Sequence, residues 1–400
     1  MKIERIFMIV AGISLLLISS CQKIDFMENI DIPVSMPENT YSKGAEVQAV
    51  LEKYVRLGIP GVIICIDDPL NGFWAGASGK ACIEDNSDMT ENHIMGIGSI
   101  AKTYINVLTL KLMEMGYITL DDPINTYLSE DIAQNVVNSS LITVRQLMNH
   151  SSGLSDFVDD TRLNLIMLDQ NFSGLTENDF RDALYRGNAL FTPGERYSYS
   201  SSNTYLLSLL IDNTMGESHA ELLNDLILVP NNYDHTYYKN YPEFPKPTGI
   251  ANFYMDRYNI GKIENITEPQ IDLMSVLKGS DGVWTSMYDL NRFFKDIFSG
   301  NILEQSSIDQ MLEGISIAPE DWIDDGISGL GIFTGHCYHD VICYTHGGSM
   351  LGSINSAYYF PDSGITLTLS ANIGGDIHSD LADLYADGLK VDILEVLFKD

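Results

Sequence analysis

The sequence predicts an α/β (α+β) fold, with an antiparallel sheet flanked by helices and a mostly helical lobe inserted into its middle. Three observations predict it. Short apolar runs bounded by turn residues lie near both ends of the chain, a strong amphipathic helix follows the N-terminal runs, and residues from about 130 to 275 have mainly helical patterning. Strands at both ends imply one sheet assembled from both ends of the chain.

The N-terminal part of the predicted sheet is a β-hairpin that follows a helix. Apolar residues at helical spacing predict a helix over residues 45–57, and Gly58 and Pro60 end it. The runs Gly61–Ile66 and Phe73–Ala77 are separated by the turn-rich stretch DDPLNG, which predicts two paired strands.

The rest of the sheet comes from the C-terminal part of the chain. Strands are predicted over Val341–Thr345, Ile354–Phe360 and Ile365–Ser370, and a closing amphipathic helix over Ser379–Phe398. The expected sheet is therefore built from residues 45–80 and 330–372.

The first twenty residues have the pattern of an export signal. A basic start is followed by the apolar run Ile6–Ile18, which is too short to span a bilayer with tolerance. The run ends in Ile18-Ser19-Ser20-Cys21, which resembles the lipobox of bacterial lipoproteins, in which a lipidated cysteine becomes the new N-terminus. We expect a lipoprotein signal peptide over residues 1–20, a tether over 21–43 and one domain over 44–400. Export and lipid anchoring of Cys21 to the cell envelope are thus predicted, with ordinary secretory cleavage as the alternative.

Composition limits the partners. The chain has 400 residues and a formal net charge of −32, which repels nucleic acid and anionic lipid headgroups. A small-molecule, peptide or ester substrate is expected, membrane contact only through the anchor, and no cofactor or metal; the oligomeric state is open.

The sharpest local feature is the tetrad Ser99-Ile100-Ala101-Lys102 at the start of the stretch SIAKTYINVLTLKLMEMG. Residues three apart on a helix lie on one face, so the hydroxyl of Ser99 and the amine of Lys102 are within reach of each other. A serine hydroxyl becomes a good nucleophile when a neighbouring group removes its proton. The free N–H groups at the helix start favour a developing oxyanion.

Two later stretches carry further polar side chains suited to catalysis. Tyr199-Ser200-Ser201 places a phenol next to hydroxyls where a loop enters an apolar helix. His346 is expected at a strand end, before Gly347 and Gly348, which let a substrate lie against the backbone. The next N–H group, that of Ser349, is in position to point at the substrate carbonyl.

These three motifs occur in the order found in the penicillin-recognising serine hydrolases, and the chain resembles the class C-like branch of that family. Further similar segments are GYITLDDPINTYL, ITVRQLMNHSSGL and HGGSMLGSINSAYYFPDSGITLTLSAN, so the resemblance extends over roughly residues 45–375. It implies a β-lactamase/transpeptidase-like fold and hydrolysis of a small amide, peptide or ester through a Ser99 acyl-enzyme. D-Ala carboxypeptidase, D-aminopeptidase, esterase and β-lactamase activities all fall in this range.

The resemblance also assigns roles. Ser99 would be the nucleophile, Lys102 its proton partner and Tyr199 the general base or proton shuttle, while His346 takes a place usually held by lysine. The backbone amides of Ser99 and Ser349 would form the oxyanion hole. The substrate would contact three further residues: Ser201, Gly347 and Gly348.

Two departures from the family pattern bear on the substrate. Ser201 stands where asparagine is usual, with a shorter reach. The stretch FTGHCYHD after Gly329–Ile332 has no arginine to hold a substrate carboxylate. We therefore expect neutral or amino-ended substrates, unless a distant lysine or arginine folds into the pocket.

The sequence allows two other interpretations, a binding protein without catalytic activity and a nicotinamide-dependent oxidoreductase. A binding protein with the same fold would lack turnover, although it has no need of serine, lysine and tyrosine together. The run from Gly96 to Ala101 fits the dinucleotide fingerprint G-x-G-x-x-A with Asp121 downstream, but it lacks a buried strand before it.

Several further side chains could form local sites. A zinc site could be proposed from four residues: His336, Cys337, His339 and Cys343. Their side chains alternate across a predicted hairpin, so not all four can converge on one metal ion. A disulfide between the two cysteines remains open. The acidic loop DFVDD, residues 156–160, is expected to be solvated.

Overall fold

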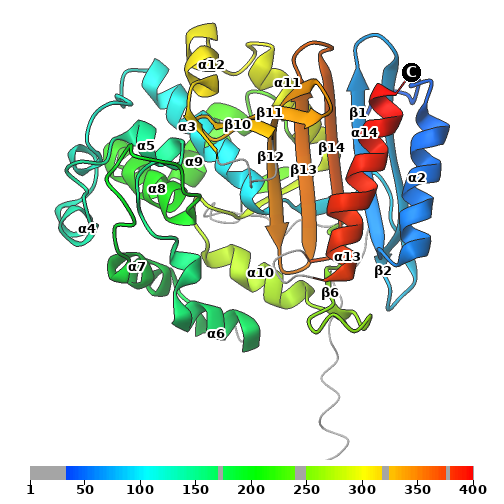
Figure 1. Cartoon of the computed structure of the whole chain (residues 1–400), viewed down its shortest axis with the longest axis horizontal. Helices are drawn as coiled ribbons and strands as arrows, with labels where there is room; N and C mark the ends of the chain where they lie inside the picture. The colour runs from blue at the N-terminus through cyan, green and yellow to red at the C-terminus, as the bar shows by residue number, and fades with distance from the viewer. Residues whose placement is uncertain (1–32, 170–173, 239–248, 318–323, 375–378, 400) are drawn as a thin grey trace, which may run out of the picture.

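A nine-stranded antiparallel sheet is the framework of the molecule (Figure 1). The computed structural model describes residues 33–169, 174–238, 249–317, 324–374 and 379–399. In spatial order the strands are β3 (Ser87–Asp88), β2 (Gly72–Cys82), β1 (Gly61–Asp68), β14 (Ile365–Ala371), β13 (Ser353–Phe360), β12 (Val341–Met350), β11 (Phe333–Tyr338), β10 (Asp324–Ser328) and β9 (Ile315–Ser316).

Strands from the N-terminal and C-terminal parts of the chain pair inside this sheet. β1 pairs with β14, with Cys65 opposite Thr368, and with β2, with Ile64 opposite Gly76. The predicted hairpin and the predicted assembly from both ends are thus confirmed, and the sheet extends further at both edges than expected.

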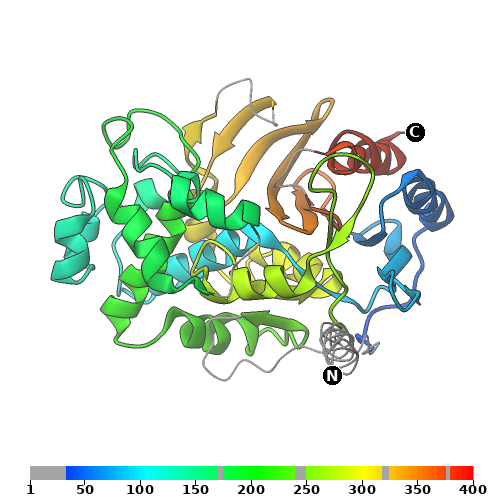
Figure 2. The ribbon, with the colours of Figure 1, turned by 90° about the horizontal axis from the view of Figure 1, so that it is seen from below.

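Each face of the sheet has its own core, because successive side chains of a strand point to opposite faces. Val62 and Ile64 of β1 face the terminal helices α2 (Gly44–Leu57) and α14 (Lys390–Phe398), whereas Ile63 and Cys65 face the larger core on the other side. Figure 2 shows α2 and α14 together on one side of the sheet and the remaining helices on the other.

The larger core is built on two helices. α3 (Ala101–Glu114) is buried on nearly all sides, and α11 (Met287–Phe298) packs against β14, β13 and β1. Beside them lies the mainly helical part of the chain (Figure 1). Its helices are α4 (Glu130–Asn135), α5 (Val144–Met148), α6 (Thr161–Asp169), α7 (Glu177–Arg186), α8 (Ser201–Met215), α9 (His219–Leu223) and α10 (Thr267–Val276).

Short strands and one further helix lie outside these groups. A three-stranded sheet consists of β4 (Ile94–Gly96), β8 (Val283–Ser286) and β5 (Thr236–Tyr238), in that spatial order. A two-stranded sheet pairs β6 (Tyr254–Met255) with β7 (Glu264–Asn265), and α12 (Gln305–Leu312) precedes β9.

The predicted C-terminal helix is present with one irregularity. α13 (Asp380–Asp383) begins where the Ser379 side chain accepts the Ala382 N–H, and it continues through a π-helical segment, η6 (Leu384–Leu389), into α14. A π-helical turn adds a residue per turn and is frequent at functional sites.

The predicted disulfide is present between Cys337 and Cys343, across the hairpin of β11 and β12. The predicted signal peptide and Cys21 lie outside the described residues. Among the helices that are described, none combines the length and apolarity needed to cross a bilayer.

Candidate active site

Ser99 and Lys102 meet at the start of α3. Ser99 lies in a single 3-10 turn, η1 (Gly98–Ile100), that leads directly into the helix. The Lys102 ammonium donates hydrogen bonds to Ser99 Oγ at 2.8 Å and to the carbonyl oxygen of Ser280 at 3.0 Å. Lys102 is only 1% exposed, so these two oxygens and its aromatic neighbours form most of its surroundings. The predicted one-face arrangement of the tetrad is present.

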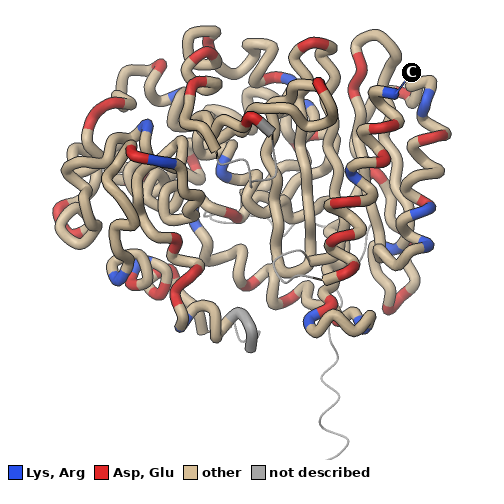
Figure 3. Tube along the Cα trace, viewed as in Figure 1, with Lys and Arg blue, Asp and Glu red and all other residues tan. Residues whose placement is uncertain are grey.

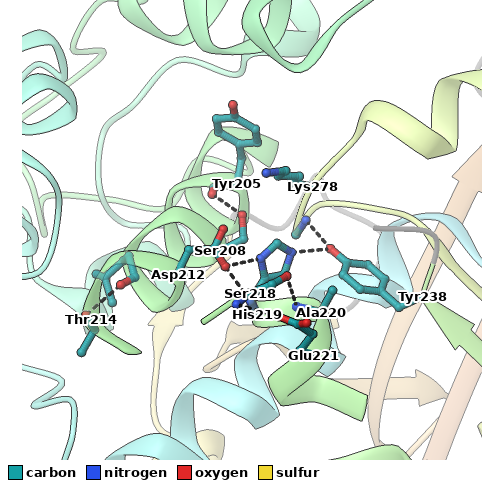
Figure 4. A network of polar contacts seen from close by, with 12 residues as sticks. Tyr205, Ser208, Asp212, Thr214, Ser218, His219, Ala220, Glu221, Tyr238 and Lys278 are labelled. Atoms are coloured by element: carbon teal, nitrogen blue, oxygen red, sulfur yellow. Dashed lines mark hydrogen bonds and ion pairs between the residues drawn. The ribbon is translucent and has the colours of Figure 1, made fainter. Parts of the chain in front are cut away.

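A chain of buried hydrogen bonds anchors the Ser280 loop (Figure 4). The Gly279 N–H donates to the Tyr238 hydroxyl at 2.7 Å, that hydroxyl lies 3.0 Å from His219 Nε2, and His219 Nδ1 lies 2.7 Å from Asp212 Oδ1. Gly279 has φ +66°, and a Cβ there would sit 2.3 Å from a backbone oxygen of α8. The carbonyl that holds Lys102 is therefore fixed by residues of α8, α9 and β5.

Strand β12 runs close against the turn that carries Ser99. A Cβ on Gly348 would lie 1.9 Å from the Ile97 carbonyl oxygen, and one on Gly98 would lie 2.9 Å from the Ser349 nitrogen. Only glycine permits this approach, which brings the Ser349 amide beside Ser99. The expectation that His346 ends its strand is wrong, because β12 continues to Met350 along this contact.

His346 is a neutral imidazole in this site. Its ring is buried, and Nδ1 donates to the Gly347 carbonyl oxygen at 2.6 Å, which leaves Nε2 as an acceptor without a partner among the described residues. Burial lowers the pKa of His346 to about 3. The hydrogen bond to Gly347 raises this pKa, and the charge of Lys102 lowers it further. His346 therefore supplies an acceptor and no positive charge.

Tyr199 lies on the segment that enters α8, with Lys102 Nζ 5.1 Å from the centroid of its ring. The imidazole of His150, a residue outside the three predicted motifs, also stacks on this phenol. The ring nitrogen Nδ1 of His150 accepts the Ser200 N–H at 3.2 Å, and its backbone oxygen accepts the Ser198 N–H at 2.9 Å. The one available signal was the stretch NHSSGL inside a family-like segment.

Ser201 is placed differently from its predicted role. It is 7% exposed at the start of α8, and its N–H donates to Asp156 Oδ2 at 2.8 Å. The expectation of a solvated acidic loop is therefore wrong for Asp156, whose carboxyl group binds the first turn of α8. Burial raises the pKa of this carboxyl group, and the hydrogen bonds from the Ser201 and Val158 N–H groups only partly offset that effect.

A cavity of about 630 Å³ opens over Ser99. This volume lies in the range of small-molecule sites. Its lining comprises Ser99, Tyr197, Ser198, Tyr199, Phe333, Thr345, His346, Gly347, Gly348, Ser349, Ile354, Asn355, Ser356, Tyr358, Tyr385, Ala386 and Lys390. All the predicted catalytic and substrate-binding residues except Lys102 and Ser201 belong to this lining, and Lys102 contacts Ser99 by a hydrogen bond.

The cavity lining includes a lysine that the sequence did not predict. The stretch around β11 offers no group to hold a substrate carboxylate, but Lys390, at the start of α14, is part of the cavity lining. We expected neutral or amino-ended substrates unless a distant lysine or arginine folded into the pocket. Lys390 is such a lysine, so the preference for these substrates no longer follows.

The dinucleotide-binding and zinc-binding interpretations do not fit the structure. Gly96 ends the short strand β4, which pairs antiparallel with β8, and Asp121 forms an ion pair with Arg145. Neither arrangement is that of a dinucleotide-binding unit. The disulfide between Cys337 and Cys343 leaves neither sulfur free to bind zinc.

Comparisons with known proteins show the family of this chain. The family model described as Beta-lactamase matches residues 47–392. A Bacillus subtilis (strain 168) protein described as a penicillin-binding protein, PbpX, is 23% identical over 317 residues, which cover 71% of this chain and 75% of that protein. Protein flp of Staphylococcus aureus (strain MW2) is 24% identical, but the match spans about half of its length.

Solved structures show the same fold. A D-stereospecific amidohydrolase from Streptomyces sp. has a TM-score of 0.74 and 24% identity, covering 89% of this chain and 98% of that one. D-amino acid amidase from Ochrobactrum anthropi SV3 has a TM-score of 0.74 and 22% identity, covering 88% and 97%. With Ser99 and Lys102 paired in a cavity between the sheet and the helices, and a family model that matches most of its length, the chain belongs to the Beta-lactamase family and is a serine hydrolase.

Proposed function

We propose that this protein hydrolyses a small amide or a short peptide through an acyl-enzyme on Ser99. The observation that carries the proposal is the 2.8 Å hydrogen bond from Lys102 Nζ to Ser99 Oγ at the floor of the cavity. Relatives named as D-amino acid amidase, D-stereospecific amidohydrolase and penicillin-binding protein support amides and peptides over other acyl donors.

In this mechanism the reactive form of the site has lost one proton, so that Lys102 is a neutral amine or Tyr199 is a phenolate. Ser99 Oγ attacks the substrate carbonyl carbon, and its proton passes to that base. The carbonyl oxygen gains negative charge, which the amides of Ser99 and Ser349 stabilise. The C–N bond then breaks, and the leaving amine takes up a proton from Tyr199 or Lys102. Water attacks the resulting ester, releases the acid and returns the proton to Ser99.

The neutral imidazole of His346 has a specific part in this scheme. Its Nε2 is a buried acceptor with no partner among the described residues, in a residue that lines the cavity. In this scheme it accepts a hydrogen bond from a substrate N–H once the side chains that cover it move aside. Gly347 and Gly348 leave the neighbouring backbone open to a substrate lying along β12. Ser201 remains a proposed substrate-binding residue, although it does not belong to the cavity lining; its N–H fixes the start of α8 by donating to Asp156.

Intact-mass analysis tests the proposal. The purified protein is exposed to D-amino acid amides, D-Ala-D-Ala peptides, short esters and β-lactams. At least one class should add the mass of its acyl group to the wild type, and the Ser99→Ala variant should acquire none. Identical adducts or identical turnover in both proteins would exclude Ser99 as the nucleophile.

For the location of the protein, we propose export and lipid anchoring through Cys21. The support is the sequence pattern alone: an apolar run that ends in Ile18-Ser19-Ser20-Cys21. In this arrangement the tether of residues 21–43 links the anchor to the folded domain.

A further inference from the structure

The His346 imidazole carries a buried acceptor atom without a donor. Its Nδ1 is engaged with the Gly347 carbonyl oxygen at 2.6 Å, whereas Nε2 has no partner among the described residues. The residue is 2% exposed although it lines the cavity. A buried acceptor without a donor destabilises a folded protein and is uncommon. A ligand N–H group that reaches Nε2 would remove this cost.

The strands around His346 offer no charged side chain as a donor. β11, β12 and β13 contain no Lys, Arg, Asp or Glu, although the chain has 55 acidic and 23 basic side chains. Figure 3 shows β12 and β13 in tan along their length. The nearby Lys102 ammonium is engaged with Ser99 and Ser280. These strands therefore supply no charge that would hold a water molecule beside Nε2.

The phenyl ring of Phe333 contacts this imidazole. The two ring centroids lie 5.2 Å apart, with planes inclined by 52°. Phe333 begins β11, is 3% exposed and belongs to the lining of the same cavity. It is thus part of the surroundings of the imidazole and part of the cavity wall at once.

Other rings hold Phe333 in this position. Its centroid lies 6.3 Å from that of Tyr197, with the planes nearly perpendicular, and 6.5 Å from that of His150, with the planes nearly parallel. The ring of Tyr199 lies 6.4 Å away. Such contacts favour one placement of the ring in the free enzyme. The adjoining cavity of about 630 Å³ gives the ring room to turn when a substrate enters.

We propose that Phe333 covers His346 Nε2, keeps water away from it in the free enzyme, and thereby makes the enzyme selective for substrates with an N–H group near the scissile carbonyl. This inference rests on the proposed function. A substrate N–H that displaces the ring gains a hydrogen bond without having to replace a bound water. An analogue with an ester oxygen at the same place presents a second acceptor to Nε2 and gains nothing.

Matched esters that differ in one N–H group test the proposal. For an N–H on the acyl side, the pair is the 4-nitrophenyl esters of N-(methoxycarbonyl)glycine and (methoxycarbonyloxy)acetic acid. For an N–H on the leaving group, it is the acetate esters of methyl N-(3-hydroxyphenyl)carbamate and methyl 3-hydroxyphenyl carbonate. Each kcat/KM is divided by the rate constant for hydroxide hydrolysis of the same bond. We expect the N–H member of one pair to be favoured by about tenfold to hundredfold.

Variants then assign that preference to Phe333. Phe333→Ala should lower it about fivefold or more, because water then reaches Nε2 and the substrate must replace it. Phe333→Leu keeps part of the apolar cover and should lower it by less. Phe180→Ala removes an equally buried ring outside the cavity lining and should keep the wild-type preference. A wild-type preference near one for both pairs, or a preference unchanged in every folded Phe333 variant, would overturn the proposal.

A double-mutant cycle shows whether Phe333 acts through the imidazole. His346→Leu has no acceptor, so its preference for the N–H member should be near one. Adding Phe333→Ala to this variant should not change that preference further. A preference that still depends on Phe333 in the His346→Leu background would contradict the proposal.

Nitrogen NMR separates this inference from the proposed nucleophile. The full chain is produced with 15N-labelled histidine, and the signals that are lost in His346→Leu are those of His346. At neutral pH, Nε2 of the wild type should have the chemical shift of an acceptor nitrogen without a hydrogen bond. Phe333→Ala should move this signal upfield, toward that of a nitrogen bonded to water. Equal shifts would reject the role of Phe333 even if Ser99 proves to be the nucleophile, and a Phe333-dependent shift would support it even if Ser99 does not.

Discussion

The imidazole of His150 stacks against the phenol of Tyr199, with ring centroids 4.5 Å apart and planes inclined by 25°. The same imidazole accepts the amide of Ser200, and its burial, together with the charge of Lys102, holds its pKa well below the usual range. A neutral, fixed ring therefore supports the residue that the mechanism uses to move a proton.

This contact gives the first prediction. His150→Ala should lower kcat at least about tenfold while KM changes little, because Tyr199 loses its stacking partner and Ser200 its acceptor. His150→Phe keeps the aromatic face but not the acceptor, so it should recover part of kcat. A steady-state comparison of the three proteins measures this, and equal losses in both variants would argue against a role for stacking.

The second prediction concerns the proton-transfer groups. Lys102→Met and Tyr199→Phe should each reduce turnover by about 10²-fold or more, since each removes a group that moves a proton in the transition state. Thermal melts of the same samples serve as the folding control. Turnover like that of the wild type in a folded variant would remove that residue from the mechanism.

The third prediction concerns the hydrogen-bond chain behind Ser280. Tyr238→Phe leaves the buried Gly279 N–H without its acceptor, so it should cost about 1–2 kcal/mol of unfolding free energy. It should also lower kcat, because the Ser280 carbonyl that holds Lys102 loses its support. Urea unfolding and kinetics are compared with Tyr258→Phe, whose ring is 69% exposed. A loss of stability with unchanged kcat would show that the chain is structural only.

The fourth prediction follows from the lowered pKa of His346. The unfolded state binds a proton near pH 6.5, whereas the folded state binds it only near pH 3. Stability from this group is therefore present above about pH 6.5 and is lost as the pH falls toward 3, by a few kcal/mol in all. Denaturant unfolding between pH 7 and pH 4 should show a smaller decline in His346→Gln than in the wild type. Parallel declines would contradict the assignment.

The fifth prediction tests the anchor. If Cys21 carries lipid, wild-type protein should partition with membranes and Cys21→Ala should move to the soluble fraction. Ser20→Thr, which keeps the cysteine, is the control. Unchanged fractionation of Cys21→Ala would reject the anchor.

Local patterns predicted much of this molecule. The hairpin of β1 and β2 follows from two apolar runs around one turn, and the contact between Ser99 and Lys102 follows from their spacing on a helix. The end of β12 was misjudged because glycines are poor strand formers in isolation. Here Gly348 is required by the backbone oxygen of Ile97 beside it.

The missed residues depend on tertiary contacts. His150 reaches the Ser200 amide across 50 positions of sequence, and no local pattern reports that contact. Lys390 is one of several charged residues on an amphipathic helix, and the irregular turn of η6 precedes it. Its position in the cavity depends on how that helix docks on the sheet.

Because β1 pairs with β14, the sheet can form completely only after the C-terminal part of the chain has been synthesised. During synthesis, a chain that ends before residue 341 already contains the serine, the lysine and the tyrosine, yet it lacks β12 to complete the crevice. Such a fragment lacks the β12 part of the cavity lining, so we expect hydrolysis only after the last strands have folded. We therefore expect an incomplete chain to be inactive.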